Sequence, residues 1–352
     1  PSVVRYATLA VAALAYKDEG NLERFRQRDI NSVLVSACSP HIDNNYFIAE
    51  NMCHAISNLC LENANVSDLG KHGACGLVVN ILYLYANMHT VVTQALIAIA
   101  ALAVRQKTDK VHKGNTRKLV EKGALEVTMA VMQKFMEYDD VQRAGGLAIT
   151  ALARLDGNKL TLSALNVCEL VSNSIQTHMS NPLVVVKLIY AVEALTHFCE
   201  PNIAKFVALN VVAILLQALN KHENVYYVVE CIFKALINII LHNKATYYTA
   251  FTEAACKLYV KVLKLHEKHA KVARWGCHFI YVATAAPHMQ LHPVTAHKDA
   301  VSPHGGSEKD DNDKAKNLKD HHKAEKHEDD SERAKKLEPK PDVIPLAAVS
   351  EV

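Results

Sequence analysis

The sequence predicts an all-α protein built from repeated helical units, an α-solenoid, and three observations point to this fold class. Glycine (12) and proline (10) are scarce for 352 residues, and only Pro40, Pro182 and Pro201 lie between Pro1 and Gly276. Sheets of many short strands need turn residues at close intervals, so this composition favours long helices. Half of the chain is hydrophobic and 21% is charged, which is enough to build a large core and excludes global disorder. The third observation is an internal repeat.

A short helical motif of the form Ala-x-x-Ala/Asn-Leu-Ala recurs along the chain with variations. The copies are AVAALA (10–15), AISNLC (55–60), AIAALA (98–103), AITALA (148–153), AVEALT (191–196), ALINII (235–240) and a degenerate FIYVAT (279–284). Their starting positions are separated by 45, 43, 50, 43, 44 and 44 residues. A regular period in the forties, helical throughout, is typical of solenoids whose units contain two or three helices.

Each copy is preceded, seven positions earlier, by a β-branched hydrophobic residue that opens the helix. These residues are Val3, Ile48, Val91, Val141, Val184, Val228 and Val272. Apolar or small residues follow at i+4, i+7, i+8 and i+11, which places one apolar stripe on each helix. The pattern therefore predicts seven equivalent helices, from Val3–Ala15 to Val272–Thr284.

A second apolar helix is expected upstream in each unit, often opened by a small or polar residue. The openings are Gly73-Ala74, Gly123-Ala124, Asn166-Val167 and Asn210-Val211. They are 50, 43 and 44 residues apart, in phase with the first set of helices. Two independent markers thus keep the same period.

Three segments resemble the armadillo repeat family: VQRAGGLAITALA (141–153), GALE (123–126) and AISNLCLEN (55–63). The resemblance implies an armadillo-like right-handed α-α superhelix of about seven repeats over residues 1–287, with the first repeat truncated. HEAT repeats are the nearest alternative, but the Asp and Arg that they usually show at fixed helix positions are not found here.

The single interval of 50 predicts an insertion within residues 105–122. Seven lysines and arginines lie in this segment, against Asp109 and Glu121. Insertions in solenoids usually form loops on one face. We expect a basic loop, either solvated without a partner or in contact with an acidic partner.

The composition changes at about Pro287. Residues 288–352 are polar, proline-containing and of mixed charge, which predicts a disordered charged tail.

Charge and cysteine usage limit the class of protein. The net charge of +3 is too small to indicate nucleic-acid binding by itself. None of the nine cysteines forms a C-x-x-C pair and most lie in apolar helical runs, which favours a reducing compartment. We therefore expect a cytoplasmic location, with the nucleus as the alternative. The most apolar run, 95–104, is about half the length of a membrane-spanning helix, so no transmembrane segment is expected.

Catalytic motifs are missing from the sequence. HEKH (266–269) is one residue short of the H-E-x-x-H zinc motif, and no nucleophile elbow, phosphate-binding glycine loop or dinucleotide fingerprint is present. We expect no catalytic residues, no metal site and no cofactor, and hence a protein that is not an enzyme.

The armadillo resemblance implies that the third helix of each unit lines a concave groove, with positions three, six and ten after the opening hydrophobe facing it. The candidate partner-binding residues are Asn58, Lys187, Tyr190, Lys234, Asn238, Trp275 and His278. The lysines are expected to anchor acidic groups, the asparagines to pair with a peptide backbone, and the aromatic side chains to supply contact area. Two interpretations remain for the small apolar positions in the middle of the groove: a seat for a partner helix, or core. These positions are Ile97, Ala101, Ala144, Leu147 and Ala151.

The expected function is that of a non-catalytic interaction scaffold or adaptor that binds a segment of another protein along this groove. Acidic extended segments suit the lysines best. A nuclear transport receptor is one alternative, but such arrays carry tryptophan at the sixth and asparagine at the tenth position in successive repeats. Here no sixth position is tryptophan, and only Asn58 and Asn238 occupy tenth positions. The other alternative is a scaffold peripherally associated with a membrane.

Overall fold

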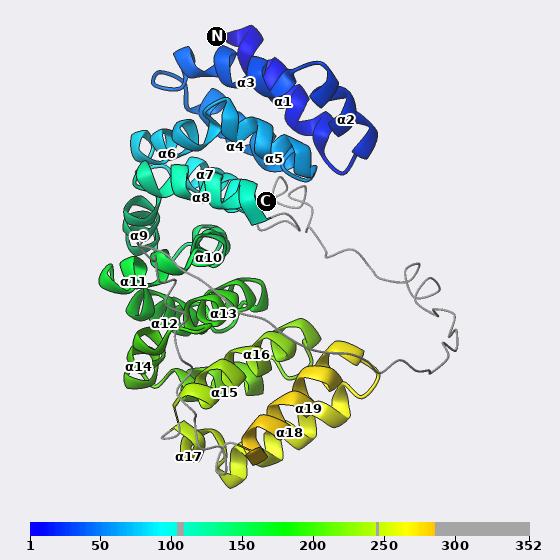
Figure 1. The fold of residues 1–352 in the computed structure, drawn as a ribbon, viewed down its shortest axis with the longest axis vertical. Coiled ribbons are helices and arrows are strands. Elements are labelled where there is room, and N and C mark those ends of the chain that lie inside the picture. The colour runs from blue at the N-terminus through cyan, green and yellow to red at the C-terminus, as the bar shows by residue number, and fades with distance from the viewer. Residues whose placement is uncertain (104–108, 244–245, 286–352) are drawn as a thin grey trace, which may run out of the picture. The chain divides into compact units, whose positions relative to one another are not determined.

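The computed structural model describes residues 1–103, 109–243 and 246–285, which belong to one compact unit, Pro1–Leu291. These residues form nineteen α-helices and one short 3-10 helix, η1 (Ser39–His41), and no strand (Figure 1). The predicted all-α class is confirmed. The predicted tail, 288–352, lies outside the described residues.

The helices group into six units of three, preceded by one isolated third helix. The first helices are α2 (Glu19–Gln27), α5 (Asn63–Lys71), α8 (Asp109–Glu121), α11 (Asp156–Ala164), α14 (Glu200–Ala208) and α17 (Thr246–Ala250). The second helices are α3 (Ile30–Cys38), α6 (Ala74–Leu84), α9 (Ala124–Lys134), α12 (Val167–Thr177), α15 (Val211–Lys221) and α18 (Glu253–Leu265). The third helices are α1 (Ser2–Ala15), α4 (Tyr46–Leu59), α7 (His89–Ala103), α10 (Asp139–Leu152), α13 (Pro182–Thr196), α16 (Tyr226–His242) and α19 (Ala270–Ala285). The prediction of about seven repeats, the first truncated, is confirmed.

The third helices form a continuous layer, in which each contacts the next from α1 to α19 (Figure 1). Since α7 lies between α4 and α10 and also packs on α6, ten of its fifteen residues are buried. This position explains the apolar run that begins at Ala95: the helix is covered on several sides by neighbouring helices. Among the described residues no single helix is long and apolar enough to span a membrane, and only the pair α14 and α15, bent by 72°, passes that test jointly.

Six of the third helices begin two residues before the predicted opening hydrophobe. The opening hydrophobe is the first residue of the helix to reach the core. The two residues before it belong to the first helical turn and point outward. In α4 and α13, Asn45 and Asn181 cap this turn by accepting hydrogen bonds from the backbone N–H groups of Ile48 and Leu183. Pro182 occupies the first turn of α13, where no N–H is needed.

The residue before five of the second helices adopts the left-handed conformation. These residues are Asp29 (φ 52°), Gly73 (φ 92°), Gly123 (φ 87°), Asn166 (φ 60°) and Asn210 (φ 56°). Glycine, asparagine and aspartate tolerate positive φ better than other residues, because they lack a bulky Cβ substituent or bond their own backbone. The chain must reverse sharply here, and this explains why small or polar residues mark the openings in the sequence.

An asparagine in five of the six first helices, all except α17, caps the preceding third helix, a feature that the sequence analysis missed. Its side-chain amide donates to a leucine carbonyl near the C-terminus of that helix, in the pairs Asn21–Leu14, Asn65–Leu59, Asn115–Leu102, Asn158–Leu152 and Asn202–Leu195, over 2.8–3.3 Å. The carbonyls at a helix C-terminus have no partner within the helix. The repeated asparagine therefore satisfies a backbone carbonyl at five junctions, and at four of them the bond is buried.

The prediction of a basic loop at 105–122 is wrong for most of its length, because Asp109–Glu121 is helix α8. This first helix has 13 residues, whereas α2, α5, α11 and α14 have 9 each. The extra residues extend a helix rather than form a loop. Lys118 of this helix is exposed, and its Nζ donates to the carbonyl of Gly70 over 2.8 Å.

Candidate functional site

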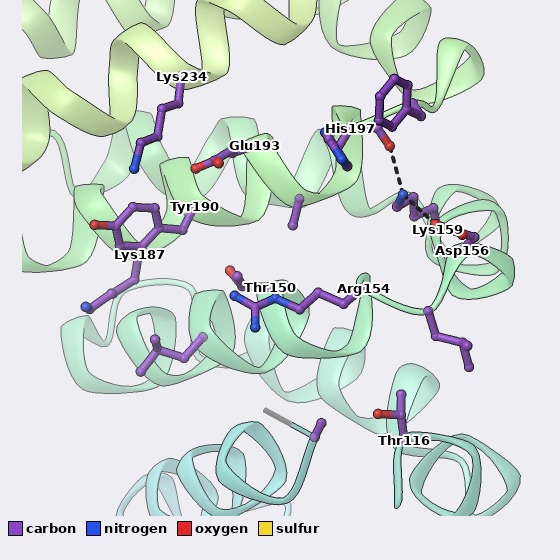
Figure 2. A pocket seen from close by; sticks show the side chains of 15 residues that line it. Thr116, Thr150, Arg154, Asp156, Lys159, Lys187, Tyr190, Glu193, His197 and Lys234 are labelled. Carbon is purple, nitrogen blue, oxygen red and sulfur yellow. Dashed lines mark hydrogen bonds and ion pairs between the residues drawn. The ribbon is translucent and has the colours of Figure 1, made fainter. Parts of the chain in front are cut away.

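A groove with a volume of about 840 Å³ crosses the layer of third helices at α10, α13 and α16, and we call it the third-helix groove. It includes three of the predicted residues, Lys187, Tyr190 and Lys234. The start of α11 closes one end of it through Asp156 and Lys159. Figure 2 shows these side chains lining the groove from α11, α13 and α16.

One face of α13 supplies Lys187, Tyr190, Glu193 and His197 to the groove (Figure 2). Their separations of three, three and four residues keep them on the same side of a helix. The close approach of α10 helps to form this wall. A Cβ atom added at Gly146 would lie 2.9 Å from the carbonyl carbon and oxygen of Lys187, so only glycine lets the two backbones meet.

Lys187 is half-buried, and no carboxylate of the described residues pairs with its ammonium group. Its Nζ lies 5.5 Å from the centre of the Tyr190 ring, a cation–π contact. Burial lowers the pKa of Lys187, and the positive charge of Arg143 lowers it further. The ammonium group is therefore partly desolvated without a compensating anion.

Lys234 has internal partners. Its Nζ bonds Oε1 of Glu230, one turn earlier on α16, over 2.6 Å, and it also lies 5.0 Å from the centre of the Trp275 ring. The exposed fractions of the Lys234 and Glu230 side chains are 20% and 14%. Much of the positive charge of Lys234 is thus neutralised inside the protein.

Trp275 and His278 lie on α19 and extend the same surface by one repeat. The Trp275 ring is half-buried, with Arg274 5.5 Å from its centre and the His278 ring at 5.9 Å. His278 is exposed. The residues predicted at Lys187, Tyr190, Lys234, Trp275 and His278 therefore lie on three successive third helices.

The two predicted asparagines join repeats to one another. The side-chain amide of Asn58 donates to the carbonyl of Ala12 over 2.8 Å, and that of Asn238 to the carbonyl of Glu193 over 3.2 Å. Both bonds run from a third helix to the preceding third helix, at equivalent places. Asn58 is buried on α4, away from the other candidates, and Asn238 is half-buried.

Several groove residues were absent from the prediction. Thr150 and Glu193 occupy the ninth position after the opening hydrophobe, and Arg154 and His197 the thirteenth. Extending the three, six, ten stripe by one more turn would have found the thirteenth position. The small apolar positions of the predicted groove differ in their environment. Ala144 and Ala151 belong to the core, while Leu147 lines the groove.

Glu193 is a half-buried acid among these cations. Burial raises the pKa of its carboxyl, and the positive charges of Lys234 and Arg154 offset part of this effect. At the end of α13, Lys159 bonds both Oδ1 of Asp156, over 2.9 Å, and the carbonyl of His197, over 2.8 Å. The groove thus combines paired charges with the unpaired ammonium group of Lys187.

Within the part of the chain that the structure describes, no three His, Cys, Asp or Glu side chains gather as a metal site. All nine cysteines are free thiols, and seven of them are buried or half-buried. Burial raises the pKa of several of these thiols, and it raises that of Cys75 to about 11. The buried thiols are therefore protonated at neutral pH.

Solved structures with the same arrangement of helices identify the fold. A designed armadillo repeat protein superposes with a TM-score of 0.57 at 17% identity, over 67% of this chain and 92% of its own. The chain has an armadillo-like fold. Two engineered proteins solved by the Northeast Structural Genomics Consortium also match. One has a TM-score of 0.62 at 15% identity, over 80% of this chain and 64% of its own. The other has a TM-score of 0.57 at 16% identity, over 67% and 89%.

At these identities the likeness concerns the fold alone. No protein-family model matches the sequence, and no curated protein matches it.

Proposed function

We propose that this armadillo-like array is a non-catalytic scaffold that binds an acidic, extended segment of a partner protein in the third-helix groove. The observation that carries the proposal is Lys187, a half-buried ammonium group in the groove without a carboxylate partner among the described residues. A carboxylate placed beside it would supply the missing counter-charge and form a charge-assisted hydrogen bond.

The other groove residues support a peptide rather than a small molecule. Tyr190 offers a rigid ring beside Lys187, and Trp275 continues the surface one repeat further. Aromatic side chains of this kind provide contact area at a small cost in conformational entropy. Lys234 contributes less charge, because Glu230 already pairs with it.

The proposal is tested by fluorescence anisotropy with three labelled peptides, rich in glutamate, rich in lysine, or uncharged, against the wild-type chain and Lys187→Met. Methionine keeps the length of the stem and removes the charge. We expect the glutamate-rich peptide to bind best and to lose about tenfold or more in affinity in Lys187→Met, as for a hydrogen bond between charged groups. High salt should weaken binding.

Lys221→Glu is the matched control, since Lys221 is exposed on the second helix α15 and does not line the groove. It should leave the affinity within about twofold of wild type at physiological salt. Preference for the lysine-rich peptide would contradict the proposal and favour a transport-receptor type of cargo. Equal binding by wild type and Lys187→Met would also reject it.

A further inference from the structure

Phe198 is an exposed aromatic residue held in an unfavourable backbone conformation at one end of the third-helix groove. It lies two residues beyond the end of α13, has a φ of 49°, and exposes 78% of its surface. Three of the other four non-glycine residues with positive φ are asparagine or aspartate, which tolerate this conformation. A phenylalanine there costs conformational energy and leaves a large apolar surface in water, and such costs concentrate at binding sites.

The surroundings of Phe198 fix it in place. The carbonyl of His197 accepts the bond from Lys159, and the N–H of Cys199 donates to the carbonyl of Thr196 over 3.2 Å. The Phe198 ring lies 4.3 Å from the ring of His197 and 6.1 Å from that of His242, at the end of α16. The ring is thus presented as a preformed wall of the groove.

This end of the groove carries apolar side chains beside the Asp156–Lys159 ion pair, whereas Lys187 lies further along the groove. Leu155 and Ala194, both half-buried, line it together with Phe198. Lys187 precedes Thr196, the last residue of α13, by nine residues, about 14 Å at the rise of an α-helix, and Phe198 lies two residues further along the chain. An extended peptide covers the distance from Lys187 to Phe198 in about five residues.

We propose that Phe198 forms an aromatic subsite for a bulky apolar side chain of the bound segment, with a carboxylate of the same segment about five residues away at Lys187. The partner segment is therefore acidic with one phenylalanine-like anchor. This inference rests on the proposed function and adds a specificity to it. The anchor would cover the exposed ring and gain the offset or edge-on contact that aromatic pairs prefer.

The test uses three labelled peptides of about twelve residues in a glycine–serine background, long enough to span the groove. The first has a phenylalanine and two glutamates about five residues apart, the second has alanine in place of the phenylalanine, and the third has the same residues about two apart. Affinity for the full chain is measured by anisotropy. We expect the first peptide to bind about tenfold more tightly than the other two.

The variant is Phe198→Asn, because asparagine accepts positive φ and so removes the ring without adding strain. Its melting temperature should equal or exceed that of wild type, which shows that the fold is intact. It should bind the first peptide about tenfold more weakly and the alanine peptide unchanged, while Phe198→Tyr retains tight binding. The matched control is Tyr248→Ala, an aromatic residue on α17 that is 82% exposed and outside the groove; it should change neither affinity.

Equal affinity of wild type and Phe198→Asn for the first peptide would overturn the aromatic subsite. If the alanine peptide still loses affinity in Lys187→Met, the proposed function survives that result. If no peptide binds Lys187→Met more weakly than wild type, both the proposed function and the subsite are rejected. A concentration-dependent dimer in sedimentation that Phe198→Asn dissociates would instead make Phe198 a contact between copies of the chain, and would also overturn the inference.

Discussion

Glu193 is a charged side chain of the third-helix groove whose environment opposes its charge. It is half-buried on α13, and burial raises the pKa of its carboxyl despite the nearby positive charges of Lys234 and Arg154. The folded protein therefore binds this proton more tightly than the unfolded chain does. Above the folded pKa the ionised carboxylate reduces the stability of the fold, and below the unfolded value it has no such effect.

The first prediction concerns Glu193→Gln, which removes this charge and keeps the shape of the side chain. At neutral pH the variant should melt at a higher temperature than wild type. The difference should shrink as the pH falls through the folded pKa of Glu193 and vanish below the ordinary pKa of a glutamate carboxyl, 4.5. Thermal unfolding of both proteins across this pH range measures it. A variant that is less stable at neutral pH would show that the attraction to Lys234 and Arg154 outweighs burial.

Single residues also show how far the sequence could predict the site. Lys187 and Tyr190 were found because a helix repeats its facing positions at steps of three and four, which holds in any armadillo-like unit. The partner of Lys234 was not found, although Glu230 lies only four residues away on the same helix. Sequence spacing permits such an ion pair on every helix, and only packing decides which pairs form.

At the scale of helices, the contact between α10 and α13 depends on Gly146. A side chain there would collide with the backbone of Lys187, which cannot move as a flexible side chain can. Gly157, at the start of α11, has no atom within 4 Å of an added Cβ. The two glycines are therefore a matched pair with opposite expected effects.

The second prediction compares Gly146→Ala with Gly157→Ala in denaturant unfolding. Gly146→Ala should lower the free energy of unfolding by about 1–3 kcal/mol, the usual range for overpacking. Gly157→Ala should leave it unchanged or raise it by about 0.5–1 kcal/mol, because alanine restricts the unfolded chain and favours helix. Because the collision involves the backbone that carries Lys187, Gly146→Ala should also lower the affinity for the glutamate-rich peptide. Stabilisation by Gly146→Ala would contradict the close approach.

At the scale of the whole described unit, every repeat is held mainly by its neighbours. The third helices contact one another in order, and α14 packs on α11, α12, α13, α15 and α16. In such arrays stability is close to a sum of local and nearest-neighbour contributions. Damage to one repeat should therefore spread only a short distance.

The third prediction uses Phe206→Ala, since Phe206 is fully buried on α14. The cavity should cost about 3–5 kcal/mol. Hydrogen exchange followed by mass spectrometry should become faster in α11 to α16 and stay unchanged in α4 to α7, which are not among the helices that pack on α14. Faster exchange throughout all repeats would show that the array unfolds as one cooperative unit instead.

The sequence by itself determined the helical class, the period of the repeat and the truncated first unit. It could do so because apolar periodicity and left-handed turn residues are local properties, repeated at every unit. The tertiary structure alone decided which charges are paired, that the residues of the expected insertion lengthen α8, that Asn58 and Asn238 bond the neighbouring repeat, and that Phe198 lies exposed at the end of the groove. These features depend on contacts between residues about forty positions apart, and their geometry is set only when one repeat packs on the next.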